Sequence, residues 1–134
     1  MIAVDTNVLA RYVTNDDPAQ SAKALQVMRH EDIFISKTVL LELEWVLRGG
    51  YKFERATIRG AMAGILGLPN VTAEDSVCVR DALQWYEAGL DFADALHVVS
   101  CSKVRRFATF DDRLVKRARK LSTVEIVSLW SEQV

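Results

Sequence analysis

The chain has 134 residues, half of them hydrophobic and about a quarter charged, with a formal net charge of −1. This composition predicts a single globular domain over residues 1–134 and excludes a disordered or low-complexity chain. No apolar run reaches the roughly 18 residues that span a bilayer and no signal-peptide pattern is present, so we expect a cytoplasmic protein without a membrane partner.

Five short β-like runs alternate with helical patterns along the chain. Such alternation is typical of crossover units and a mainly parallel sheet. We therefore expect an α/β fold, a three-layer α/β/α sandwich with a sheet of about five strands. The expected strands are residues 2–4, 33–35, 71–73, 106–109 and 124–127.

Capping residues define the expected helices. Asp17 followed by Pro18 predicts an N-cap and a first-turn proline, with a helix running to about residue 29. Ser36 predicts the cap of the next helix, which we expect to end at Gly49 and Gly50. Further helices are expected at residues 54–66, 75–88, 91–103 and 112–120.

Two acidic residues directly follow expected strands. Asp5 follows the first strand and Asp111 the fourth, so both fall at the strand edge where open α/β sheets bind ligands. Each also precedes a helix, where capping is an ordinary role for aspartate. Convergence of acids from parallel strands favours a site over caps. The neighbouring Asp112 is a further acid that shares either role with Asp111.

The expected helix after Ser36 carries two glutamates. A helical wheel places Glu44 away from the apolar face, with Arg48 four residues on, which predicts an ordinary surface ion pair. Glu42 lies on the edge of the apolar face beside Val46, where an acid is costly unless a cation or hydrogen bonds compensate it. Glu42 is therefore the candidate functional acid of this helix.

Asp94 lies three residues after Asp91 and just after Gly89, which ends the preceding helical pattern. This spacing resembles a capping box, in which both carboxylates would satisfy backbone amides. A functional role for Asp94 is an equal alternative, with Asp91 as a possible further acid.

Taken together, the acids indicate a metal site. Converging carboxylates repel one another unless a hard divalent cation binds between them, and oxygen ligands favour Mg²⁺, with Mn²⁺ as an alternative. Such an ion activates water for attack on a phosphodiester. The sequence leaves one or two ions open. The candidate acids are Asp5, Glu42, Asp94 and Asp111.

Residues 103–120 contain eight basic residues against two acidic ones, a local charge of +6. Such a cluster beside an acidic site can hold phosphates, although composition alone favours a solvated helix face. The candidates for binding phosphates of a nucleic acid are Arg113, Lys116 and Arg117. The three tryptophans, Trp45, Trp85 and Trp130, are interpreted as core or interface anchors.

The chain resembles PIN-domain nucleases, and among them the VapC toxins of bacterial type II toxin-antitoxin pairs. Four segments carry the resemblance, and together they span nearly the whole chain in the order found in the family. They are the segment 5–7 after the first strand, 36–43 with its apolar helix, 91–95, and 109–111.

The resemblance implies a Mg²⁺-dependent endoribonuclease that cuts RNA and is inhibited by a cognate antitoxin. It implies that Asp5, Glu42, Asp94 and Asp111 form the acidic cluster, with Asp5 and Asp94 as the main metal ligands. It further implies a homodimer, with the apolar helix around Trp45 as a candidate partner surface. Supporting groups that orient carboxylates or water would be Thr6, Asn7 and Thr109.

Two other functions are weighed against the nuclease. Haloacid dehalogenase-type phosphatases also place an aspartate after the first strand, but they need a second aspartate two residues later, and this chain has Asn7. A catalytically inactive PIN-like adaptor that binds RNA or protein is the other alternative. Loss of one of the four acids would indicate an adaptor, and all four are present.

Overall fold

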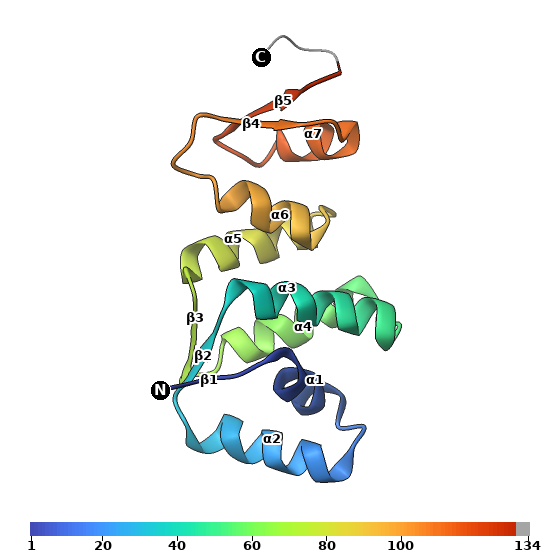
Figure 1. Cartoon of the computed structure of the whole chain (residues 1–134). Coiled ribbons are helices and arrows are strands. Elements are labelled where there is room, and N and C mark those ends of the chain that lie inside the picture. The colour runs from blue at the N-terminus through green and yellow to red at the C-terminus, as the bar shows by residue number, and fades with distance from the viewer. Residues whose placement is uncertain (131–134) are drawn as a thin grey trace. The chain divides into compact units, whose positions relative to one another are not determined.

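The structure is a computed structural model that describes residues 1–130. The chain divides into two compact units, Met1–Ser76 and Val77–Val134. Each unit has its own parallel sheet and its own helices (Figure 1).

The first unit contains a three-stranded parallel sheet in the order β1-β2-β3. In register, Ile2 pairs with Ile33, and Ile33 pairs with Val71. Ile33 and Ile35 of the central strand are fully buried. The strands are β1 (Ile2–Ala3), β2 (Ile33–Ile35) and β3 (Val71–Ala73), and the helices are α1 (Thr6–Thr14), α2 (Pro18–His30), α3 (Lys37–Trp45) and α4 (Arg55–Leu66).

Capping side chains begin the helices of this unit as the sequence predicts. The Asp17 side chain accepts a hydrogen bond from the amide of Gln20, with Pro18 in the first turn of α2. Ser36 accepts one from the amide of Val39. The helix after Ser36 does end at Gly50, but its last five residues, η1 (Val46–Gly50), form a π-helical turn instead of continuing the α-helix.

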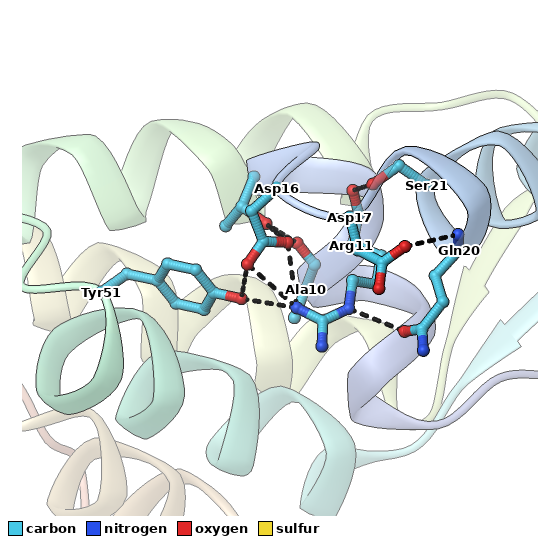
Figure 2. A network of polar contacts seen from close by, with 8 residues as sticks. Ala10, Arg11, Asp16, Asp17, Gln20, Ser21 and Tyr51 are labelled. Atoms are coloured by element: carbon cyan, nitrogen blue, oxygen red, sulfur yellow. Dashed lines mark hydrogen bonds and ion pairs between the residues drawn. The ribbon is translucent and has the colours of Figure 1, made fainter.

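A polar network ties the end of α1 to the start of α2 (Figure 2). Arg11 donates from Nη1 to both carboxylate oxygens of Asp16, at 2.9 and 3.1 Å, and from Nε to Gln20 at 2.8 Å. Tyr51, from beyond η1, donates to Asp16 at 2.7 Å and accepts from Arg11 at 2.8 Å. These bonds connect three separate segments of the first unit around one carboxylate.

The second unit contains a two-stranded parallel sheet. Strands β4 (Arg106–Thr109) and β5 (Glu125–Ser128) pair in register from Arg106 opposite Glu125 to Thr109 opposite Ser128. Helix α7 (Asp112–Ala118) connects the two strands and packs against both. Helices α5 (Ser76–Glu87) and α6 (Phe92–Val99) are joined by a tight turn at Gly89, whose φ of 109° favours glycine.

Most expectations for the fold are confirmed. The chain is an α/β protein with parallel strands, and each of the five strands occurs within one residue of its expected position. The strands pair as a set of three and a set of two. The helix expected at 91–103 ends at Val99, because its last turn tightens into a bond from the amide of Cys101 to the carbonyl of Val98. Within residues 1–130, no helix has the length and hydropathy needed to cross a bilayer.

Candidate functional site

Asp5 lies between the end of β1 and the start of α1. Its Oδ1 atom accepts a hydrogen bond of 3.2 Å from the amide of Val8, so the residue caps the helix. Asp5 is therefore a helix cap, a role that the expected convergence of the acids on one site disfavoured. The side chain is exposed, and among the described residues Oδ2 accepts no hydrogen bond. A cap and a metal ligand are compatible here, because the two roles use different oxygens.

The two residues after Asp5 have different surroundings. Thr6 is 5% exposed and lies in the first turn of α1. Asn7 is exposed and lines a pocket of about 230 Å³, which α1 and α2 form together. Apolar side chains such as Val8, Ala24 and Val27 make up much of the wall of this pocket.

The prediction for the two glutamates of α3 is wrong about burial. Glu44, expected on the surface, is 2% exposed, whereas Glu42 is exposed. The expected ion pair does form, with Arg48 Nε 2.8 Å from Glu44 Oε2 and Nη2 3.3 Å from Oε1. Arg48 thus compensates the buried charge of Glu44, and Glu42 remains accessible to a cation from solvent.

Asp91 and Asp94 differ in whether the carboxylate caps α6. Asp91 is the N-cap of α6, and its Oδ1 accepts the amide hydrogen of Asp94 at 3.1 Å. The reciprocal bond of a capping box is missing, because the Asp94 carboxylate has no hydrogen bond among the described residues. Both of its oxygens are therefore available to a ligand.

Asp111 and Asp112 also differ. Asp111 caps α7, with Oδ1 accepting from the amides of Arg113 at 2.9 Å and Leu114 at 3.1 Å. Its own amide donates to Thr109 Oγ1 at 3.0 Å. Asp112 instead accepts a 3.0 Å hydrogen bond from the buried hydroxyl of Ser128, which gives this carboxylate a structural partner.

The electrostatics of the second unit centre on Asp94. Burial raises the pKa of this half-buried carboxyl, and the negative charges of Asp91 and then Asp111 raise it further, while His97 opposes the effect. Asp91, Asp94 and Asp111 therefore lie close enough for their charges to interact. Asp111, and not Asp112, is the member of the doublet that acts on Asp94.

The proposed site residues fall in both units. Asp5 and Glu42 belong to the first unit, and Asp94 and Asp111 to the second. Over the part of the chain that the structure describes, no group of three or more Asp, Glu, His or Cys side chains is gathered closely enough to hold a metal. The chemistry of the donors nevertheless suits a hard divalent cation, because all four side chains offer carboxylate oxygens.

The basic run divides into groups with different partners. Arg117 donates from Nη1 to the carbonyl of Gly89, and Arg119 donates from Nε to that of Ile126 at 3.1 Å. Arg113 and Lys116 are exposed on α7 and have no ion pair among the described residues. At the amino ends of β4 and β5, three further cations, Lys103, Arg105 and Arg106, line an open groove of about 860 Å³.

An exposed pair of aromatic rings next to Asp111 was not predicted from the sequence. Phe110 is 59% exposed and Trp130 is 70% exposed, and their ring centroids are 4.9 Å apart. Trp45, at 62%, is exposed as well, so of the two roles expected for the tryptophans, core or interface, exposure excludes the core role for Trp45 and Trp130. The sequence feature that could have indicated this aromatic surface is the position of Phe110 directly before Asp111, a candidate metal ligand.

Comparison with known families gives a clear assignment. No curated protein matches the chain closely enough to serve as a relative. A family model, described as the PIN domain, matches residues 2–120. The match covers most of the chain and includes all four candidate acids, from Asp5 to Asp111. The chain therefore belongs to the PIN domain family.

Proposed function

We propose that the protein is a Mg²⁺-dependent endoribonuclease. PIN domains are generally nucleases, and the family match through residues 2–120 is the observation that carries the proposal. All four acids lie within that match. It also favours a nuclease over the phosphatase considered above.

Carboxylate oxygens would bind the ion. Asp5 and Asp94 are the proposed main ligands, with Glu42 and Asp111 completing the set. In Asp5 and Asp111, Oδ1 accepts the capping hydrogen bonds, so Oδ2 is the oxygen available to bind the ion. When bound, the ion would polarise the scissile phosphate and lower the pKa of an attacking water.

The surrounding residues orient these ligands and the substrate. Thr109 holds the backbone of Asp111 through its hydroxyl, which restricts the position of that carboxylate. Thr6 and Asn7 are proposed to do the same beside Asp5. Arg113 and Lys116 would bind RNA phosphates, because they are exposed and have no acidic partner among the described residues.

We further propose that this nuclease is the toxin of a toxin-antitoxin pair and acts in the cytoplasm as a homodimer. The resemblance of the four motif segments to VapC toxins supports this. Trp45 at the end of α3 is exposed and is the proposed partner contact, whereas Leu40 and Leu43 of the same helix are buried within the chain. A small reading frame next to this one, whose product binds the protein and relieves growth arrest, would support the pairing.

RNA cleavage with purified protein tests the enzymatic proposal. We expect single-stranded RNA to be cut with Mg²⁺ and to stay intact with EDTA, and we expect Asp5→Asn and Asp94→Asn to abolish cutting. Asp32→Asn is the matched control, because Asp32 is an exposed aspartate outside the proposed site. Intact RNA with the wild type under every condition would overturn the nuclease and favour the inactive adaptor.

A further inference from the structure

Phe110 and Trp130 form an exposed aromatic pair in the second unit. The ring planes are inclined by 56°, with centroids 4.9 Å apart, and more than half of each residue is exposed. Folding normally buries large aromatic side chains because their apolar area is costly in water. Two touching rings that stay in solvent are therefore typical of a binding surface.

The backbone holds this pair in place. Phe110 follows β4 and Trp130 follows β5 closely, so both rings stand at the carboxyl ends of paired parallel strands. The amide of Leu129 donates to the carbonyl of Thr109 at 2.9 Å, which extends the strand pairing up to the rings. The rings are thus presented by a sheet and not by a free loop.

A side-chain hydrogen-bond chain adds to this support. The amide of Trp130 donates to Ser128 Oγ at 3.3 Å, and Ser128 Oγ donates to Asp112 Oδ1 at 3.0 Å. Ser128 is buried, so its hydroxyl links the start of α7 to the residue that carries the indole. A surface ordered before binding loses less entropy when a ligand arrives.

The aromatic pair also borders the proposed chemistry. Phe110 immediately precedes Asp111, whose carboxylate caps α7 and interacts with that of Asp94. The exposed cations Arg113 and Lys116 follow on the same helix. Proteins that bind single-stranded nucleic acids combine aromatic rings, on which the bases stack, with cations that bind the phosphates.

We propose that Phe110 and Trp130 form a stacking platform for a base of single-stranded RNA, adjacent to the phosphate that is cut. The inference rests on the proposed nuclease function and specifies how its substrate is held. Stacking tolerates any base, because every base has a π face, so the platform would position RNA without reading a sequence. Its removal should weaken RNA binding by roughly 10- to 100-fold.

Equilibrium binding in EDTA tests the platform without cleavage. The probe is a fluorescently labelled 12-nucleotide single-stranded RNA of mixed sequence. We expect Trp130→Ala and Phe110→Leu to raise the Kd at least tenfold, and Trp130→Phe, which keeps a ring, to stay within threefold of the wild type. Val77→Ala is the control, since it removes an exposed apolar side chain from the second unit that belongs to no proposed site or partner surface.

An abasic oligonucleotide with the same backbone separates stacking from charge. The wild type and Trp130→Ala should bind this probe equally, because no base is present to stack. A tenfold loss on the abasic probe, an unchanged Kd on the full RNA, or no RNA binding by the wild type would overturn the platform. A changed oligomeric state of Trp130→Ala would assign the rings to a subunit contact and overturn it too.

Cleavage with Mg²⁺ distinguishes this failure from failure of the nuclease. If the wild type cuts RNA and the ring variants keep the wild-type KM, the platform is overturned and the nuclease stands. If RNA binds in a ring-dependent way but is never cut, the nuclease is overturned and the binding surface stands.

Discussion

The backbone amide of Asp94 donates to Oδ1 of Asp91, three residues earlier, at 3.1 Å. Asp91 thus caps α6, while Asp94 belongs to the first turn of this helix and its carboxylate has no hydrogen bond among the described residues. Helix capping and the proposed metal binding therefore use different residues, or different oxygens of one residue, in this chain. Variants that remove the charge but keep the cap make this separation measurable.

Asp111 is the clearest case, since its Oδ1 accepts two amides at the start of α7. We expect Asp111→Asn to unfold like the wild type but to lose cleavage, because asparagine caps as well as aspartate yet carries no charge. Asp111→Ala should lose cleavage and also about 1 kcal/mol of unfolding free energy. Urea denaturation and an RNA cleavage assay together measure both effects.

Asp17 supplies the control for this pair, because it caps α2 through Gln20 and belongs to no proposed site. Asp17→Ala should cost a similar amount of stability while leaving cleavage unchanged. Loss of stability in Asp111→Asn equal to that in Asp111→Ala would contradict the separation of roles.

The charged carboxylate of Asp94 should lower the free energy of unfolding of the metal-free protein. Its pKa is raised by burial and by Asp91 and Asp111, so the folded state holds the proton more tightly than the unfolded state does. The stability that protonation provides is present at low pH and is lost as the pH rises through the raised pKa. In EDTA at pH 7, Asp94→Asn should therefore be more stable than the wild type, by about 0.5 kcal/mol for a partly solvated charge.

The stability gain of Asp94→Asn should shrink as the pH falls from 7 to 4, because the wild-type carboxyl takes up its proton as the pH falls through the raised pKa. Denaturation at the two pH values measures the difference, with Asp32→Asn as an exposed control. A variant less stable than the wild type at pH 7 would show that the Asp94 charge is not unfavourable in the fold.

The Tyr51–Asp16 hydrogen bond predicts the opposite pH dependence. The pKa of Asp16 is lowered, chiefly by the hydrogen bond from Tyr51 and further by those from Thr14 and Arg11. The stability of this network (Figure 2) is therefore present above the unfolded-state pKa and lost as the pH falls through the lowered one. Tyr51→Phe should therefore lower the free energy of unfolding near pH 7, and lower it less in acid.

Tyr12→Phe is the control for Tyr51, because it removes a hydroxyl that has no hydrogen bond among the described residues. Thermal unfolding from pH 7 to pH 2.5 measures both variants. An equal loss in Tyr51→Phe at all pH values would contradict the link to the Asp16 charge.

RNA binding should depend on salt through α7. Replacing Arg113 and Lys116 by alanine removes two exposed cations, so the slope of log K against log salt should fall by about 1.4 for single-stranded RNA. Arg117 is left intact because it donates to the Gly89 carbonyl, and its loss would also disturb the fold. An unchanged slope in a titration from 50 to 400 mM salt would show that Arg113 and Lys116 face solvent and do not bind RNA phosphates.

Most helix and strand positions could be predicted from local signals in the sequence. Pro18 after Asp17, Ser36 and Gly89 start or stop helices through contacts within a few residues, and the structure has helix boundaries at each. The strand positions followed from short runs rich in β-branched and apolar residues that lie between such signals. The early end of α6 at Val99 is the exception, because no glycine or proline follows it.

The sequence by itself determined the α/β class, the order of strands and helices, and the four acids through which the family match runs. Only the tertiary structure decided which charged side chains are buried. Glu44 is covered and Glu42 is not, because burial on α3 depends on which elements from elsewhere in the chain pack on each face. The same holds for Phe110 and Trp130, 20 residues apart, whose rings meet only because β4 and β5 pair in parallel.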